Sequence, residues 1–458
     1  MPQSSALATE EIEYIPTIEP IRLTWGILLV AFAIFCTICL TSVLLGHFFF
    51  FQSSAPLDMT LTVGKGTVRV KIGTEREQAE SRFRNLTTET TISTDSTDLW
   101  SQATINFVDP NYEQLIVTMS LKGNTTVRLE DANRPRFNWT GSNYLISLVD
   151  LTGEIDILVS DGLNRAISVS ILTPSGIEMF LLSSGRYVID ASLNEVSIVN
   201  RSGQAAIIPD IANRTMGESV GEGERATVLG EETVITRTPA PIELLDNGNL
   251  NTVIPYQDST AQIINDPPFD WTCTNGPANN LPRGNYYHDI APDGRASFHL
   301  KRLNGATSNG YTRCSQTFPE GLDVTQYDYL ALQAVLYINY QSLTGCGVEA
   351  SECPLMLYVD YTDINGVSGR RWFHGVYARP LPTNSSWKRL CDDCVQEHIL
   401  IYEKTWYIYN SGNWLNLFVG DRRPATINAI YFYAEGHEYD VFVDEVAILA
   451  RPIGEQQP

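Results

Sequence analysis

The stretch LTWGILLVAFAIFCTICLTSVLLGHFFFF, residues 23–51, constrains this chain more than any other feature. It contains no Asp, Glu, Lys or Arg. As an α-helix rising about 1.5 Å per residue, the stretch would reach roughly 43 Å. That length exceeds the roughly 30 Å hydrocarbon core of a bilayer. We therefore expect a single membrane-spanning helix.

A cleaved signal peptide is the alternative interpretation of the same residues. Its apolar region should be only about 7 to 15 residues long. The small-residue site Ser53-Ser54-Ala55, where cleavage would fall, is followed directly by Pro56. Both observations favour an uncleaved anchor.

The cysteines indicate how the anchor is oriented. Of the eight cysteines, Cys36 and Cys39 lie in the apolar stretch. An even set clustered near the C-terminus is typical of disulfides in an oxidising compartment. That set is Cys273, Cys314, Cys346, Cys353, Cys391 and Cys394. With Arg22 as the flanking cation, we expect a single-pass protein of the cell membrane, with residues 1–22 cytoplasmic and the bulk of the chain extracytoplasmic.

Length and charge narrow the class of protein. A chain of 458 residues predicts two or three folded units. The net charge of −22, from 31 basic and 53 acidic residues, leaves no electrostatic surface for nucleic acid. We expect the membrane to be a partner, and nucleic acid not to be one.

Residues 60–230 carry the alternation of a mainly β fold. In GTVRVKI the apolar side chains of Val68, Val70 and Ile72 alternate with polar ones, which is the period of a half-buried strand. Similar short runs follow, separated by turn pairs such as Asp161-Gly162. No long helical period interrupts them, so an all-β unit is predicted.

The order of these pieces resembles the FecR-type periplasmic domain. The resemblance rests on VGKGTVRV, LVDLTGEIDILVSD, SILTPSGIEMFLLSSGRYVID and GEGERATVL within residues 60–230. FecR-family regulators combine one membrane helix with a periplasmic β domain and a cytoplasmic part that holds a sigma factor. Here that part is the 22-residue tail, too short to bury a core, so a signalling role would require the tail to act as a linear peptide.

A second β unit is predicted after a change in composition. Residues 231–242 lose their periodicity and contain Pro239 and Pro241, which predicts an extended linker. Residues 243–452 are rich in aromatic residues and carry strand-like runs without intervening helices, typical of a β-sandwich. These runs are 330–338, 355–361, 415–419, 427–434 and 441–449.

This second unit is similar to the galactose-binding-like jelly roll, a fold that many carbohydrate-binding modules share. The similar segments are ELLDNGNL, CSQTFPEGLDVTQYDYLALQAVLYI and YDVFVDEVAIL. We expect 244–250 to form its first strand and turn. Such modules often hold a structural calcium between the first and last strands, which implies Asp246, Asn247, Asp444 and Glu445 as candidate oxygen ligands. The alternative is an Asn-Gly turn followed by two solvated acids.

Clusters of aromatic residues are the candidate binding surface, because flat rings can stack on sugar faces. Most of the aromatic residues should be core or cross-strand pairs. The favoured cluster follows GVSGRR and consists of Trp372, Phe373, His374 and Tyr377. A glycan or an envelope protein is the expected ligand.

The six C-terminal cysteines predict three disulfides: Cys273 with Cys314, Cys346 with Cys353, and Cys391 with Cys394. The alternative is a zinc site made of Cys391, Cys394 and His398. In an oxidising compartment the disulfides are favoured.

No catalytic motif is evident. None of the six histidines lies in a metalloprotease or nucleophile-elbow context. A carboxylate pair such as Asp360 with Glu435 is expected by chance among so many acids. We therefore predict no enzyme and no cofactor other than calcium. The expected function is extracytoplasmic binding; the alternative is a transmembrane regulator.

Overall fold

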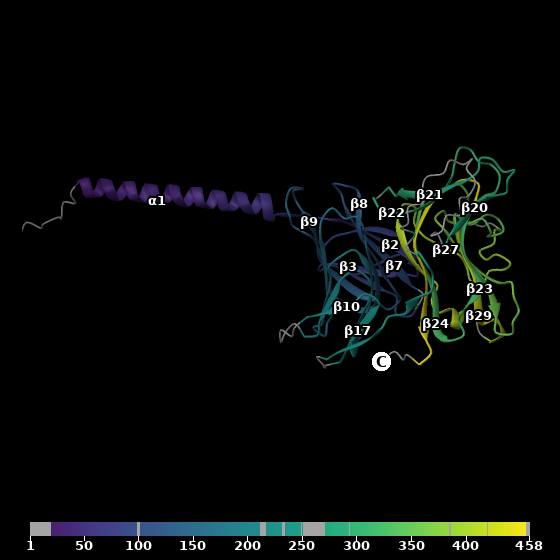
Figure 1. The fold of residues 1–458 in the computed structure, drawn as a ribbon. Helices are drawn as coiled ribbons and strands as arrows, with labels where there is room; N and C mark the ends of the chain where they lie inside the picture. Colours follow the sequence, from purple (N-terminus) through teal and green to yellow (C-terminus); the bar gives the residue numbers. More distant parts are fainter. Residues whose placement is uncertain are drawn as a thin grey trace, which may run out of the picture. The chain divides into compact units, whose positions relative to one another are not determined.

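The computed structural model describes residues 20–98, 101–210, 217–230, 234–248, 250, 271–292, 294–383, 386–418 and 420–454. Figure 1 shows one long helix and otherwise β-structure, which confirms the predicted mainly β class. The chain divides into two compact units. One is Met1–Ser54 with Pro135–Ser142, and the other is Ala55–Arg134 with Asn143–Pro458.

The first unit contains helix α1 (Pro20–His47), which continues into a π-helical segment, η1 (Phe48–Gln52). Among the described residues, Thr24–Gln52 is the one helical stretch long and apolar enough to be a membrane span or a signal sequence, with a mean hydropathy of 2.7. Within this unit Phe137 contacts Phe49 and stacks on Trp139, with ring centroids 5.6 Å and 4.7 Å apart. Most of the predicted cytoplasmic tail, residues 1–19, lies outside the described residues.

The first part of the second unit is a closed barrel of short strands. Its strands are β1(Ser54–Pro56), β2(Asp58–Lys65), β3(Val68–Ile72), β4(Gln78–Glu80), β5(Phe83–Leu86), β6(Thr90–Thr94), β7(Gln102–Asp109), β8(Gln114–Leu121), β9(Thr126–Pro135), β10(Tyr144–Val159), β11(Ile167–Leu172), β12(Glu178–Leu181), β13(Gly185–Ala191), β14(Glu195–Ser202), β15(Ala205–Ile208), β16(Glu218–Val220), β17(Glu224–Leu229) and β18(Ile235–Pro239).

The longest barrel strand, β10, changes partners along its length. Its first half pairs with β9 and, in parallel, with β11, whereas its second half pairs with β8 and β13. Gly153 marks the change, with a φ of +92°. A Cβ there would lie 2.6 Å from the Asn124 carbonyl oxygen, so only glycine fits this close approach between backbones.

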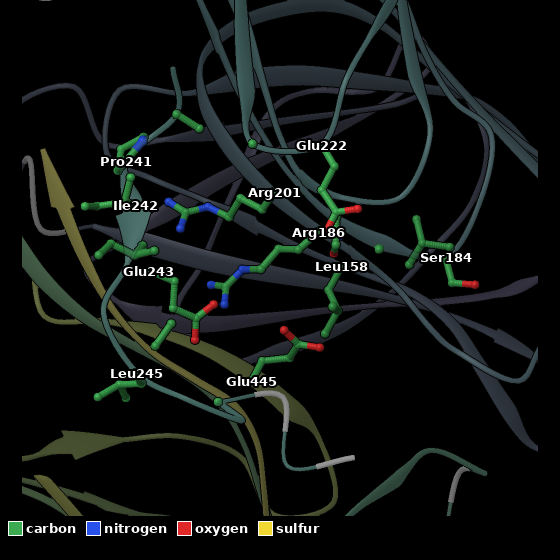
Figure 2. Close-up of a pocket in the computed structure, with 18 of the residues that line it drawn as sticks. Leu158, Ser184, Arg186, Arg201, Glu222, Pro241, Ile242, Glu243, Leu245 and Glu445 are labelled. Atoms are coloured by element: carbon green, nitrogen blue, oxygen red, sulfur yellow. The ribbon is translucent and has the colours of Figure 1, made fainter. Parts of the chain in front are cut away.

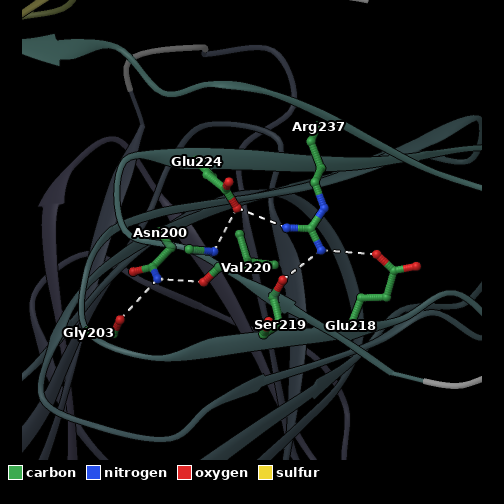
Figure 3. A network of polar contacts seen from close by, with 8 residues as sticks. Asn200, Gly203, Glu218, Ser219, Val220, Glu224 and Arg237 are labelled. Atoms are coloured by element: carbon green, nitrogen blue, oxygen red, sulfur yellow. Dashed lines mark hydrogen bonds and ion pairs between the residues drawn. The ribbon is translucent and has the colours of Figure 1, made fainter.

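The predicted linker is wrong for residues 235–239, because they form β18, antiparallel to β17. Arg237 fixes this edge strand, since its guanidinium donates to Glu224 and Glu218, both at 3.0 Å (Figure 3). Beneath it the buried Asn200 amide donates to the Val220 carbonyl at 2.8 Å. A strand rich in threonine and proline shows no hydrophobic period because its side chains cover little core.

The second part of the unit is a pair of facing sheets. One has the strand order β21-β22-β30-β24-β28 with β19 beside β30, and the other has the order β20-β23-β29-β25-β26-β27. The strands are β19(Ile242–Glu243), β20(Thr272–Gly276), β21(Asn285–Ile290), β22(Ala296–Arg302), β23(Gly310–Asp323), β24(Tyr327–Gln341), β25(Leu355–Asp363), β26(Arg370–Tyr377), β27(Ile399–Leu400), β28(Trp406–Asn410), β29(Pro424–Gly436) and β30(Tyr439–Pro452).

Two local predictions in this sandwich are wrong. Residues 415–419 were expected to form a strand, but Trp414–Leu417 is a helical turn, α2, capped by the Asn413 side chain. The first strand is β19 at residues 242–243, and residues 245–248 form a turn rather than a strand. In both places a short apolar run did not distinguish a strand from a turn packed on the core.

The three disulfides join the pairs that the sequence predicted: Cys273–Cys314, Cys346–Cys353 and Cys391–Cys394. Cys273 and Cys314 face each other across β20 and β23. Their chain separation of 41 residues makes this the disulfide that closes the longest loop. It fixes an edge strand that follows residues 251–270, which lie outside the described part.

The barrel packs on the outer face of the sheet that contains β24, β28 and β30. Leu115 and Leu158 of the barrel form an apolar cluster with Val335, Trp406 and Phe442 of the sandwich, among others. A polar contact runs beside this cluster. The Tyr407 hydroxyl donates to the Gln102 side chain at 2.6 Å, and the Gln102 amide donates to the Ile408 carbonyl at 3.2 Å. The barrel therefore covers the outer face of one sheet, and the outer face of the other sheet carries a separate apolar cluster that includes Cys353, Tyr358 and Tyr433.

Candidate functional site

The outer face of the second sheet carries aromatic side chains where solvated polar ones are usual. Along β29, Phe432 and Ala434 point into the core, while the alternating Tyr431, Tyr433 and Glu435 point to the opposite face. Strands β25 and β26 add Tyr358 and Phe373 beside them. We call Phe373, Tyr358, Tyr431, Tyr433, Tyr311 and Arg313 the aromatic platform.

Register explains why these residues meet. Phe373 lies opposite Tyr358, which lies opposite Tyr431, so three neighbouring strands each place one ring in a single row. The rings stack with centroids 4.5 Å and 4.6 Å apart and interplanar angles of 10° and 15°. The faces of these rings are occupied by one another, and the row is largely packed away from solvent, because Tyr358 and Tyr433 are buried and Phe373 and Tyr431 are half-buried.

Arg313 extends the row across β23. Its guanidinium carbon lies 4.8 Å, 5.0 Å and 5.7 Å from the ring centroids of Tyr311, Tyr433 and Tyr431. This arrangement is a cation–π cage around a half-buried cation. Its Nε is inaccessible and has no hydrogen-bond partner among the described residues. The cage thus holds the guanidinium in place and leaves hydrogen-bonding capacity unused.

Polar groups lie at both ends of the platform. At one end Asn309 donates its amide to Glu435 at 3.0 Å, and burial raises the pKa of the Glu435 carboxyl above its ordinary value. At the other end the Tyr358 hydroxyl and the Asn428 amide donate to the two oxygens of Asp360, at 3.2 Å and 2.9 Å. Burial, with the Asp360 charge second, raises the pKa of Tyr358 to about 12. The platform therefore combines a packed row of rings, in which Tyr358 and Tyr433 are buried, with polar groups at both of its ends.

The predicted binding cluster is split by strand alternation. Trp372 is fully buried and packs against Trp414, and His374 is buried beside Tyr409. Their burial contradicts the prediction that Trp372 and His374 present a surface to a sugar. Phe373 and Tyr377 lie on the other face, packed against the cluster that contains Tyr358. Consecutive strand residues point to opposite faces, so a contiguous set could not form one surface.

The four predicted calcium ligands do not form an oxygen-only cluster. Asp444 is buried and accepts hydrogen bonds from Arg295, with Nε and Nη2 at 2.8 Å and 2.6 Å from Oδ2. Glu445 lies 3.9 Å from the same guanidinium. The backbone carbonyl of Asn247 accepts from Trp271, and the backbone of Asp246 bonds to Gln316. A guanidinium therefore already neutralises Asp444, and these residues do not fit calcium, which requires six or more oxygens.

The zinc alternative conflicts with the disulfides. In the described part of the chain, His398 lies near both Cys346–Cys353 and Cys391–Cys394, the two cysteine–histidine groups compact enough for a metal. All four of these cysteines are oxidised. The ring of His398 is also satisfied, because Nε2 donates to the Ala350 carbonyl and Nδ1 accepts from the Gly375 amide, both at 2.8 Å.

The geometry also separates the two carboxylates considered as a glycosidase pair. Asp360 lies opposite Ala429, and Glu435 follows six residues further along β29. At a rise of about 3.3 Å per residue, the two carboxylates are about 20 Å apart. Glycosidases hold their two carboxyl groups within roughly 5 to 10 Å, so Asp360 and Glu435 do not form such a pair.

The sequence matches no protein-family model and no curated protein. Among solved structures it is similar to a candidate anti-sigma factor from Parabacteroides distasonis, at 12% identity and a TM-score of 0.23, over 32% of this chain and 59% of that one. It is also similar to the CBM22-1 xylan-binding domain of Xyn10C from Paenibacillus barcinonensis, at 10% identity and a TM-score of 0.21, over 39% of this chain and 85% of that one.

A third similar structure is the C-terminal family 22 carbohydrate binding module of Xyn10B from Clostridium thermocellum, at 12% identity and a TM-score of 0.21, over 41% of this chain and 89% of that one. This chain spans about three fifths of the anti-sigma factor candidate's length. Similarities at these TM-scores do not indicate a function, so a function is inferred only from the side chains of the platform.

Proposed function

We propose that this chain is a membrane-anchored, non-catalytic binding protein that recognises a glycan through the aromatic platform. The observation that supports the proposal is the row of three rings closed by Arg313, whose buried Nε has no hydrogen-bond partner in the part of the chain that the structure describes. Sugars present hydroxyl groups around apolar C–H surfaces. The half-buried rings of Phe373 and Tyr431 would meet the C–H surfaces, and Arg313, Glu435 and Asp360 would meet the hydroxyl groups.

The helix at Thr24–Gln52 and the three disulfides support the rest of the proposal. The helix would hold the protein at the cell membrane with its N-terminus in the cytoplasm. The disulfides favour the oxidising side of the membrane for the β-structure. Because Asp360 and Glu435 are too far apart to act as a glycosidase pair, we favour binding without turnover.

The test is a binding screen with the full chain in lipid nanodiscs against soluble neutral polysaccharides, xylan included, measured by affinity electrophoresis and calorimetry. We expect Tyr431→Ala and Arg313→Ala to weaken binding at least about tenfold, equivalent to about 1.4 kcal/mol. Tyr340→Ala is the matched control, because it removes a half-buried tyrosine of β24 in the other sheet.

Equal binding by the three variants would show that the platform is not the binding site. Failure to bind any polysaccharide would contradict the proposal that the ligand is a glycan. In that case co-purification of the full chain with a sigma factor through residues 1–22 would favour the transmembrane regulator.

A further inference from the structure

A cavity of about 590 Å³ lies where the barrel meets the sandwich, away from the aromatic platform (Figure 2). Its barrel wall comes from β10, β13 and β14, and its sandwich wall comes from residues 242–248 and β30. Ligand pockets commonly occupy roughly 300 to 1,000 Å³ and often lie at junctions between folded parts. The cavity therefore has the size and the place of a small-molecule site.

Two arginines extend from the barrel into this cavity. Figure 2 shows Arg186 and Arg201 running side by side toward Glu243. Arg186 is neutralised by Asp156, with Nε and Nη2 at 3.3 Å and 3.1 Å from the carboxylate oxygens. Arg201 makes no hydrogen bond or ion pair with any residue that the structure describes, and its Nε is inaccessible and unpartnered. Burial, with Arg186 second, lowers the pKa of Arg201 to about 10, so the group remains a cation at neutral pH.

Carboxyl groups come from both walls of the cavity. Glu445 enters the lining from a bulge in β30, where its φ is +49°. A bulge of this kind redirects a side chain, and a positive φ for a residue other than glycine costs backbone energy. Glu243 lies beside it, so that burial and the Glu445 charge raise the pKa of Glu243 to about 7. Asp161 and Glu222 are also in the lining.

The balance of these charges determines what the cavity can hold. Arg295 lies 3.9 Å from Glu445 but is already paired with Asp444 at 2.6 Å. A simple anion would pair with Arg201 but would meet the carboxyl groups of the lining, and a simple cation would leave Arg201 without a counterion among the described residues. A ligand that carries both charges can pair with both kinds of group. Its carboxylate can accept two hydrogen bonds from the Arg201 guanidinium, and its ammonium group can face the Glu445 carboxylate.

We propose that this cavity binds a small zwitterion, an amino acid or short peptide, with its carboxylate on Arg201 and its ammonium group on Glu445. Such a ligand would contact barrel and sandwich together. The site is independent of the glycan proposal, because none of its residues belongs to the platform.

Calorimetry on the full chain in nanodiscs tests this inference, with glycine, both enantiomers of alanine and dialanine as probes, and acetate and methylammonium as half-ligands. We expect a zwitterion to bind with a Kd of about 1 mM or tighter. Arg201→Gln and Glu445→Gln should each weaken it at least about tenfold. Arg225→Gln is the matched control, a second barrel arginine whose buried Nε is unpartnered but which lies outside the cavity lining.

Three results would overturn the proposal: binding of none of the zwitterions, acetate binding as tightly as glycine, or equal affinity in Arg201→Gln and Arg225→Gln. If Arg201→Gln does not fold, Glu445→Gln provides the test, because the Glu445 side chain is 23% exposed and is not part of the core. Tyr431→Ala should leave zwitterion binding unchanged, which separates this site from the glycan platform.

Discussion

The barrel and the sandwich are both β-structure, yet they are stabilised differently. The barrel core is almost entirely aliphatic, with Phe107, Tyr144 and Tyr187 as its aromatic members, and residues 60–230 contain no cysteine. The sandwich core includes several tryptophans, among them Trp271, Trp372 and Trp414, and the sandwich carries three disulfides.

Edges explain the difference. In the closed barrel the longer strands have neighbours on both sides, and the edge strand β18 is held by the ion pairs of Arg237. A sandwich ends in edge strands such as β20, which have one neighbour each. Covalent links and large rings hold those strands in place, and the same rigid sheet then supports the platform.

The largest expected effect concerns the barrel. Asp156→Ala removes the partner of Arg186 where the two side chains are 2% and 4% exposed. Leaving a buried guanidinium without its counterion costs about 3 to 5 kcal/mol. We expect the free energy of unfolding to fall by that amount, measured by urea denaturation of the barrel transition.

Asp150→Ala is the control for this prediction. Asp150 pairs with Arg128 at 3.0 Å, but the side chains are 59% and 32% exposed. An exposed pair contributes about 0 to 1 kcal/mol. Similar losses from Asp150→Ala and Asp156→Ala would show that the barrel does not depend on its buried ion pair.

The next effect concerns the sandwich. Replacing Cys273 and Cys314 together by serine opens a loop with a chain separation of 41 residues. The chain-entropy model gives a loss of roughly 4 kcal/mol for a loop of that size. We expect the sandwich to unfold at lower urea concentration while the barrel transition is unchanged, followed by tryptophan fluorescence.

The same double substitution at Cys391 and Cys394 is the matched control, since that pair is separated by 3 residues. A much shorter loop should contribute less, roughly 2 kcal/mol in the same model. If both double variants shift both transitions equally, barrel and sandwich unfold as one cooperative unit, and the comparison between them fails.

Alternation and cysteine count predicted much of this architecture. Val68 and Val70 are buried as the pattern required, and the six C-terminal cysteines are joined in the predicted pairs. The alternation can be recognised within a single strand, and the disulfides follow from one even set of six cysteines. Leu415 and Ile235 show where this kind of prediction fails. Leu415 lies in a helical turn that was expected to be a strand, and Ile235 lies in a strand that was expected to be a linker, because such short segments carry no hydrophobic period.

The platform was not predicted, because its residues come from four strands. Tyr358, Tyr431 and Arg313 are far apart in sequence, and their meeting depends on the register of β23, β25, β26 and β29. A signal was present in the alternation of IYFYAEG, where Tyr431, Tyr433 and Glu435 share one face. The predicted cluster of Trp372 and Phe373 is inconsistent with the same two-residue alternation, because neighbouring strand residues point to opposite faces.

The smallest expected effect tests the same alternation through pH. His374 points into the core, where Nε2 donates to the Glu397 carbonyl at 3.0 Å and Nδ1 faces Gln396. Burial lowers the pKa of His374 to about 3, whereas the unfolded chain titrates near 6.5. Between these values the unfolded state binds the proton and the folded state does not, so stability falls as pH falls below about 6.5.

One pKa unit corresponds to about 1.4 kcal/mol, so the buried His374 should lower the free energy of unfolding of the sandwich by about 2 kcal/mol as the pH falls from 6.5 to 5. The measurement is the difference in this pH dependence between the wild type and His374→Gln. His437→Gln is the control, because His437 is half-buried between β29 and β30 rather than in the core. An unchanged pH dependence in His374→Gln would mean that this ring is solvated, and the inward face of β26 would then have to be reassigned together with the outward position of Phe373.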